Sequence, residues 1–222
     1  MLAASDSEGC SVTYARQEDR IRSVVPDAGL HGRRRCLAAA AAALAATALP
    51  ACTARAPLRV GFLGGLSGRI ADLGIGGRNG TELAVEEINA SGGIDGRPIE
   101  LMPRDDEQDA EVARRQAAGL FDAGIACLIG PMTSQMAAAI LPLAEQRGVP
   151  VVSPLAGANE LSRRRDGFFR VVSDAATSAR QLGRAMYRRG LRRVVPVTDI
   201  GNATFTRGWN TALAEQFVAD GG

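Results

Sequence analysis

From Leu58 onward, short apolar runs alternate with segments whose apolar residues recur every three or four positions. Short apolar runs are typical of buried strands, and the longer recurrence is typical of helices. The pattern predicts strands over 58–63, 98–102, 125–129, 149–153, 168–172 and 193–197, and helices over 81–90, 110–123, 134–146, 175–186 and 209–217. This alternation predicts an α/β fold with parallel sheets covered by helices on both faces.

Each predicted helix has an apolar face. Asp109 is the expected N-cap of the second helix, and Pro142 is expected to kink the third by removing a backbone donor. The long segment 154–167 is the best candidate for a domain boundary or a crossover. The expected buried faces are Ala84 and Ile88; Ala110, Ala113, Ala117 and Leu120; Ala175, Ala179, Leu182 and Met186; and Trp209, Ala212, Leu213 and Phe217.

The residues before Leu58 carry a different pattern. Three arginines at 33–35 precede the apolar run 37–49, which is followed by Pro50, Ala51 and Cys52. These are the three parts of a signal peptide, and the run is too short for a membrane span of about 20 residues. Its end resembles a bacterial lipobox, so we expect residues 1–52 to be an N-terminal extension and lipoprotein signal, with Cys52 lipidated. The alternative is a buried alanine-rich helix with Cys52 in its core.

The amino-acid composition limits the kinds of catalytic and metal site that the chain can form. The chain of 222 residues is 46% hydrophobic and has a formal net charge of +2, which argues against a nucleic-acid partner. It has no Lys, and its single His, His31, precedes the apolar run of the signal. A mature chain without His or Lys cannot form a Ser-His-Asp triad, a Cys-His pair or a Schiff base, and with only two cysteines it lacks the usual metal-ligand clusters. We therefore expect no catalytic residue, no metal and no cofactor.

Ligands of open parallel sheets bind where strands end and the following loops begin. Four such loops stand out, at 64–68, 130–134, 154–158 and 199–205. The first is glycine-rich, but its spacing is not that of a dinucleotide-binding loop, and a helix is predicted only after Arg78. A flexible turn explains these glycines as well.

Two polar groups near these loops allow more than one interpretation. Thr133 and Ser134 lie at a predicted helix start, where hydroxyl and N–H groups would accept a carboxylate, yet the same residues are common N-caps. The acidic run 105–107 with Asp109 would suit carboxylate catalysis. It is also typical of a solvated loop that places negative charge near a helix N-terminus. The pattern alone favours N-capping and a solvated loop.

A set of ordered motifs carries a family resemblance. They are Val60-Gly61-Phe62, Leu66-Ser67-Gly68, the run AVEEINASGGIDG at 84–96, Asp105-Asp106, Ile129-Gly130-Pro131 and the run GVPVVSP at 148–154. Together they resemble the leucine/isoleucine/valine-binding protein family over nearly all of residues 58–222. The resemblance implies a type I periplasmic-binding fold, in which two α/β lobes close over a ligand. We then expect a first lobe over 58–172 and the start of a second over 173–222, with the chain stopping inside it.

The resemblance also implies ligand-binding residues. Ser134 matches a serine that binds the ligand carboxylate, and Leu155 and Gly157 match a loop that holds the ligand's charged ends. Gly157 replaces a threonine, and Leu73 and Phe205 stand where many members have tyrosine, which leaves room for a less polar carboxylate than an amino acid. The expected ligand-binding residues are Ser67, Leu73, Met132, Thr133, Ser134, Leu155, Ala156, Gly157 and Phe205.

The protein has three candidate functions. The leading one is the extracytoplasmic solute-binding component of an ABC importer, which binds an amino acid or other small carboxylate and contacts a membrane permease. A lipid anchor would hold it at the periplasmic membrane or the cell surface. The second is a ligand-binding sensory module of a receptor with the same fold. The third, an α/β enzyme, lacks support because the mature chain would have no His, no Lys and no nucleotide-binding loop.

Overall fold

A computed structural model describes residues 55–162 and 167–222 of the chain. The predicted export signal and Cys52 lie outside these residues. In chain order the elements are β1 (Leu58–Gly64), α2 (Ala71–Ala90), β2 (Ile99–Asp105), α3 (Ala110–Asp122), β3 (Cys127–Ile129), α4 (Ser134–Arg147), β4 (Val151–Ser153), η1 (Asn159–Leu161), β5 (Phe168–Arg170), α5 (Ala175–Arg188), η2 (Ile200–Asn202) and α6 (Ala203–Ala219).

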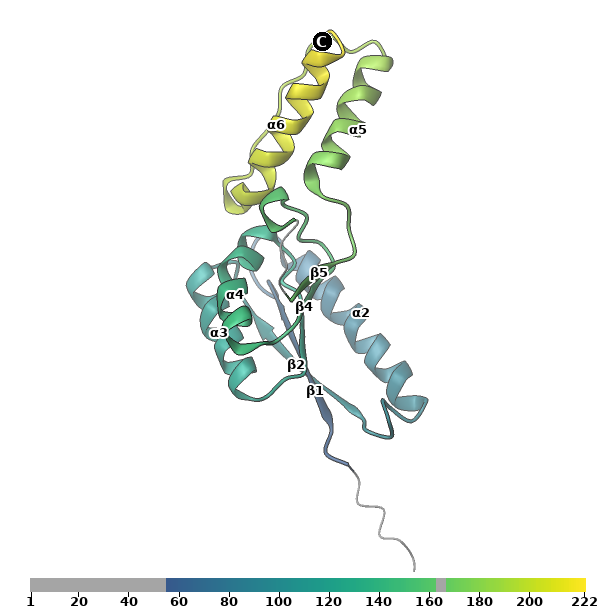
Figure 1. Ribbon diagram of the computed structural model, residues 1–222, viewed down its shortest axis with the longest axis vertical. Coiled ribbons are helices and arrows are strands. Elements are labelled where there is room, and N and C mark those ends of the chain that lie inside the picture. The colour runs from purple at the N-terminus through teal and green to yellow at the C-terminus, as the bar shows by residue number, and fades with distance from the viewer. Residues whose placement is uncertain (1–54, 163–166) are drawn as a thin grey trace, which may run out of the picture. The chain divides into compact units, whose positions relative to one another are not determined.

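The five strands form one parallel sheet in the order β2-β1-β3-β4-β5. Val60 of β1 pairs with Leu101 of β2 on one side and with Cys127 of β3 on the other. Helices α3 and α4 lie on one face of the sheet, and α2 lies on the other (Figure 1). The predicted α/β class and the parallel sheet are therefore confirmed.

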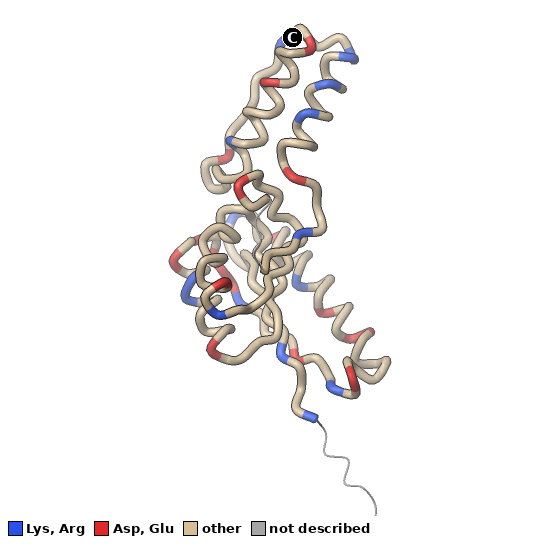
Figure 2. Tube along the Cα trace, in the orientation of Figure 1, with Lys and Arg blue, Asp and Glu red and all other residues tan. Residues whose placement is uncertain are grey.

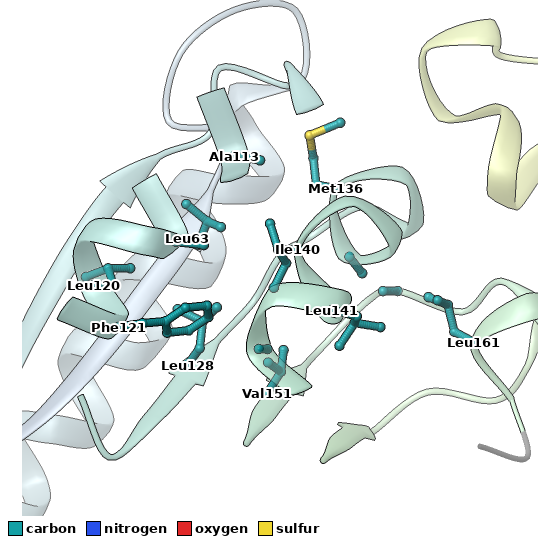
Figure 3. Close-up of a cluster of buried hydrophobic side chains, with 14 of the residues drawn as sticks. Leu63, Ala113, Leu120, Phe121, Leu128, Met136, Ile140, Leu141, Val151 and Leu161 are labelled. Atoms are coloured by element: carbon teal, nitrogen blue, oxygen red, sulfur yellow. The ribbon is translucent and has the colours of Figure 1, made fainter. Parts of the chain in front are cut away.

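The main core lies between the sheet and the helices α3 and α4 (Figure 3). Leu63, Leu128 and Val151 project from three neighbouring strands and pack in one cluster with Leu120 of α3 and Ile140 of α4. All five side chains are fully buried. Burying each of them stabilises the fold by about 1.5–3 kcal/mol relative to leaving it exposed.

Helices α3 and α4 begin as their sequences predict. The Asp109 carboxylate accepts hydrogen bonds from the backbone N–H groups of Glu111 and Val112, so it is the N-cap of α3. Helix α4 continues through Pro142 and ends at Gly148, whose left-handed backbone (φ 64°) suits glycine. The residues that α3 buries are Ala113, Ala117, Leu120 and Phe121.

The predicted start of helix α2 is wrong. It begins at Ala71, ten residues before the predicted 81, and its first half contains several glycines. A Cβ at Gly74 would lie 2.0 Å from the carbonyl oxygen of Gly65, so only glycine allows the helix to begin directly against the loop after β1. Glycine has a low helix propensity, so the sequence pattern did not predict a helix over these residues. In the structure, the close packing overrides that propensity.

The predicted inner face of α2 is also wrong. Ala84 and Ile88 are exposed, whereas Asn89 is half-buried. The Asn89 amide donates to the carbonyl of Ile99 at 2.9 Å, and its oxygen accepts from the N–H of Ile99 at 2.7 Å. This pair of bonds fixes the rotation of the helix against β2, so that the face with Thr81, Val85 and Asn89 turns inward.

Helices α5 and α6 pack against each other (Figure 1) and bury a second, smaller cluster that includes Ala179 and Leu213. A Cβ at Gly183 would lie 3.0 Å from the carbonyl oxygen of Leu213, so glycine gives the closest approach here. Leu182 was predicted to face inward, but it is exposed because Gly183 occupies the contact. The outer face of α5 carries a row of exposed arginines (Figure 2), namely Arg180, Arg184 and Arg188.

The segment 193–197 was predicted to be a strand, and this prediction is wrong. The segment belongs to no strand or helix, and Val195 and Val197 are 90% and 84% exposed. Within the described part of the chain, no strand lies beside it to complete a hydrogen-bonded ladder. Strand identity depends on such a neighbour, and the apolar pattern alone does not supply one. None of the helices among the described residues is both long and apolar enough to cross a membrane.

Candidate functional site

The order of the strands places a topological switch point at the carboxyl end of the sheet. After β1 the chain crosses to β2 on one side, and β3 then joins β1 on the other side. Strand β1 leads to α2, and β3 leads to α4. Because these two helices lie on opposite faces of the sheet, the loops that follow β1 and β3 separate at this point. Ligands of open α/β sheets bind at such a switch point. The loops that meet there are 65–70 after β1 and 130–133 after β3, next to 154–158 after β4.

A turn after β2 holds the loop after β1. The Asp105 carboxylate accepts hydrogen bonds from the N–H groups of Leu66 and Glu107, both at 2.8 Å. The Gln108 side chain reaches the carbonyl of Ser67 at 3.5 Å. Burial opposes ionisation of Asp105, but hydrogen bonds from Ser67, Glu107 and Leu66 together lower its pKa. Ser67 itself is exposed.

The expectation that the acidic run 105–107 is solvated is wrong for Asp106. Its side chain is 1% exposed and accepts a hydrogen bond from the Gln108 N–H at 2.9 Å. Burial and the neighbouring charge of Asp105 raise the pKa of Asp106 to about 6, although the bond from Gln108 opposes this rise. The turn after β2 buries Asp106 because this turn holds the loop after β1. The part of the prediction that concerned Asp109 stands, since Asp109 is exposed and caps α3.

The start of α4 shows N-capping by Thr133 and a contact of Ser134 with the loop after β4. Thr133 is the N-cap, and its hydroxyl accepts from the N–H of Met136 at 3.4 Å. The Ser134 hydroxyl accepts from the N–H of Ala158 at 3.0 Å, so it ties α4 to the loop after β4. Met132, Thr133 and Ser134 are all buried. N-capping is therefore present, and Ser134 also has a bracing role that the sequence did not reveal.

Ser153 is a second brace between the loops, and sequence reasoning missed it. Its hydroxyl donates to the carbonyl of Pro131 at 2.6 Å and accepts from the N–H of Ala156 at 3.0 Å. Ser153 is fully buried, so both bonds form away from water and are costly to break. A serine at the last position of a buried strand is the sequence signal that could have suggested this role.

The loop after β4 meets α6 at the expected residues. Leu155 is exposed, whereas Ala156 and Gly157 are buried. A Cβ at Gly157 would lie 3.5 Å from the Phe205 ring and 3.2 Å from the carbonyl oxygen of Ser173, so the loop and the ring are in close contact. A Cβ at position 157 would press on the carbonyl of Ser173, whereas its contact with the Phe205 ring would be an ordinary one.

The turn η2 also contacts the loop after β1 and the start of α4, through two residues that sequence reasoning missed. Asp199 pairs with Arg69, with both carboxylate oxygens 3.3 Å from Arg69 Nη2. The Asn202 side-chain oxygen accepts from the N–H of Gln135, in the first turn of α4, at 3.3 Å. Hydrogen bonds from Gly201 and Arg69 lower the pKa of Asp199. These contacts join residues 67 and 130 positions apart, so local pattern gives no sign of them.

Besides Leu155 and Phe205, the expected residues fall into two groups. Met132, Thr133, Ser134, Ala156 and Gly157 lie together, joined through the brace between Ser134 and Ala158. Ser67 and Leu73 are exposed beside the loop after β1. Within residues 55–162 and 167–222, no group of three or more His, Cys, Asp or Glu is placed to hold a metal ion. The arrangement suits binding through backbone N–H groups, hydroxyls and apolar walls.

Known proteins match this arrangement over part of their length. The Leu/Ile/Val-binding protein of Escherichia coli K12 is 33% identical over 107 residues, which make up 48% of this chain and 29% of that protein. A branched-chain amino acid transporter substrate-binding protein from Streptococcus pneumoniae, solved with isoleucine, has a TM-score of 0.69 and 28% identity over 72% of this chain and 47% of its own. A solute-binding protein from R. palustris, solved with benzoate, has a TM-score of 0.68 and 30% identity over 75% and 46%.

The matched stretch spans less than half the length of each of these proteins. A model of the family described as Periplasmic binding protein matches residues 57–222, which is well over half of this chain. The sheet order, the loops at its carboxyl end and this match agree with one another. The chain therefore belongs to the periplasmic binding protein family, an extracytoplasmic family of binding proteins that are not enzymes.

Proposed function

We propose that this chain forms the ligand-holding edge of a solute-binding component of an ABC importer. The observation that carries the proposal is the meeting of three loops and the start of α4 at the switch point of a sheet of this family. The ligand class is an amino acid or an aromatic carboxylate. Support for this class comes from the related proteins solved with isoleucine and with benzoate.

The carboxylate of the ligand binds at the start of α4. The N-terminus of a helix favours an anion through its unpaired N–H groups and the helix dipole. The Ser134 hydroxyl already accepts a bond from Ala158, so its own proton is available to donate to the ligand. Leu73, Leu155 and Phe205 supply an apolar wall for the rest of the ligand.

Residues 58–172 form one lobe, and residues 173–222 belong to a second lobe. The sheet lies entirely within the first range, and α5 and α6 pack on each other within the second. A ligand that touches both lobes favours the closed arrangement in proportion to its affinity difference between closed and open states. Contacts of Phe205 and η2 with the first range are the places where such closure acts.

Substitution of Ser134 tests the ligand site. In the full-length gene product, Ser134→Ala should weaken the binding of isoleucine or benzoate by about 1.5–3 kcal/mol, as expected for a lost hydrogen bond to a charged group. Ser91→Ala is the control, because Ser91 bonds only within the end of α2. Isothermal titration calorimetry measures both variants. Unchanged affinity in Ser134→Ala, or no binding of either compound by the wild type, would contradict the proposal.

We further propose that the protein is exported and anchored to the membrane through a lipid on Cys52, where it meets a permease. The signal pattern at 33–52 supports this proposal. Mass spectrometry of the membrane fraction should find an acylated peptide that begins at Cys52. Mature protein that still contains residues 1–51 would show that this part of the proposal is wrong.

A further inference from the structure

Helix α5 carries a row of arginines on the side that does not pack against α6. Arg180, Arg184 and Arg188 recur every four residues, and all three are exposed (Figure 2). The buried side of α5, which includes Ala179 and Gly183, contacts α6. Residues four apart lie next to each other on a helix surface. The three residues therefore form one continuous row, which is called the arginine row below.

The arginine row lies in a stretch of the chain that has no acidic residue. No Asp or Glu occurs between Asp174 and Asp199. The whole chain, by contrast, has a formal net charge of only +2. Positive charge is therefore concentrated on and just after α5. The arginines of this stretch are Arg180, Arg184, Arg188, Arg189, Arg192 and Arg193.

The fold does not use the arginine row. Among residues 55–162 and 167–222, no arginine of α5 forms an ion pair. Arg192, just after the helix, differs, because it lies 4.0 Å from the centre of the Tyr187 ring and donates to the Tyr187 carbonyl at 3.0 Å. Like charges four residues apart destabilise a helix. The row therefore weakens α5 slightly and contributes no contact in return, which points to a partner outside the chain.

Acidic residues at the ends of the helix pair leave the row unneutralised. The Asp174 carboxylate accepts from the N–H and the hydroxyl of Thr177, both at 2.8 Å. The Asp220 carboxylate accepts from the Gln216 side chain at 3.0 Å. Neither carboxylate forms an ion pair with an arginine in the described part of the chain.

We propose that the arginine row is a docking surface for an anionic phospholipid membrane. Guanidinium groups bind phosphate oxygens through paired N–H donors, and several cations on one face attract an anionic leaflet together. Arg184, Arg188 and Arg189 also border a shallow hollow, which gives room for a lipid phosphate. The inference goes beyond the proposed function and does not depend on the ligand site.

The surroundings of the row favour a membrane over a protein or a nucleic acid. Protein interfaces have apolar cores enriched in aromatic residues, and single-stranded nucleic acids stack on aromatic side chains. Helix α5 is described in full, and its one aromatic residue, Tyr187, packs edge-on against Phe217. The other exposed residues beside the row are Gln181, Leu182 and Ala185. Such a face supplies charge without an aromatic anchor, and charge is what a lipid surface requires.

Two variants of the row separate charge from guanidinium geometry. The neutral variant combines Arg180→Gln, Arg184→Gln and Arg188→Gln, and the charged variant replaces the same three residues by Lys. Each is made in the full-length gene product with Cys52→Ser, so that no lipid anchor adds to binding. Circular dichroism should show both variants folded, since the row forms no ion pair among the described residues.

A matched control removes the same charge elsewhere. It combines Arg104→Gln, Arg115→Gln and Arg207→Gln, which are exposed residues of β2, α3 and α6 without an ion pair in the described part of the chain. Co-sedimentation compares vesicles of phosphatidylcholine alone with vesicles of equal parts phosphatidylcholine and phosphatidylglycerol. The measurement is repeated at high salt, which screens exposed charges.

The wild type should prefer the phosphatidylglycerol vesicles and lose this preference at high salt. Each arginine near an anionic surface strengthens binding by about fivefold, so the neutral row variant should bind up to about 100-fold more weakly. The charged row variant should bind like the wild type, because Lys keeps the charge. The control should stay close to the wild type.

Three results would overturn the inference. The first is a wild type without preference for phosphatidylglycerol, and the second is an equal loss in the neutral row variant and the control. The third is a loss in the Lys variant, which would indicate a protein carboxylate bound bidentately by guanidinium. Calorimetry with isoleucine and benzoate tests the ligand site separately, so failure of the proposed function leaves the vesicle result decisive.

Discussion

Gly74 offers a sharp test of how α2 joins the sheet. It is the one buried residue that α2 contributes among the described residues. A Cβ added there would lie 2.0 Å from the carbonyl oxygen of Gly65 and 2.6 Å from its carbonyl carbon. These are backbone atoms, so no rotamer change relieves the overlap. To restore even a 3.0 Å separation, the helix or the loop must move by about 1 Å.

Two opposing terms set the expected stability of Gly74→Ala. Alanine gains about 0.8–1.0 kcal/mol over glycine in a helix interior. Overpacking against a rigid neighbour costs about 1–3 kcal/mol, and the backbone overlap places this substitution at the upper end. The net loss should therefore be about 1–2 kcal/mol. Gly76→Ala and Gly80→Ala are matched controls, because a Cβ at either position meets nothing within 4 Å. Both should gain about 0.8–1.0 kcal/mol.

Urea unfolding followed by circular dichroism measures the three variants against the wild type. Gly74→Ala should unfold at a lower urea concentration than the wild type, and the two controls at a higher one. If Gly74→Ala fails to fold, the controls should still fold with raised stability. A Gly74→Ala variant as stable as Gly80→Ala would refute the close contact between α2 and the loop after β1.

The remaining predictions concern pH. Asp106 ionises near 3.8 when unfolded and at about 6 when folded, so the fold loses stability as pH rises between these values, by roughly 2–3 kcal/mol. Asp106→Asn should remove this loss, so the variant should be more stable than the wild type at pH 7 and equally stable below about pH 4. Unfolding midpoints measured across this pH range test the prediction. The same pH profile in Asp106→Asn and in the wild type would contradict the burial of the Asp106 charge. Asp109 has the opposite sign, because backbone bonds from Val112 and Glu111 lower its pKa. Asp109→Asn removes this charge but keeps the capping oxygen, so it should lose stability at pH 7 and match the wild type in acid. A variant more stable than the wild type at pH 7 would contradict the stabilising effect of the Asp109 charge.

The sequence by itself determined the α/β alternation, the parallel sheet and the family. Strand β1 and helix α3 were predictable because their signals are local. A continuous apolar run marks a strand buried on both faces, and Asp109 with an alanine and leucine stripe marks a capped helix with one buried face. The loops at the strand ends were also foreseen, because parallel sheets gather them at one edge.

Only the tertiary structure decided the features that depend on partners distant in the chain. The start of α2 depends on how closely Gly74 approaches Gly65, and the burial of Asp106 depends on the loop that its turn supports. The contact of Asn202 with α4 joins segments 67 residues apart. Propensity and periodicity describe neighbours along the chain, whereas these features are set by steric fit and hydrogen bonds across space.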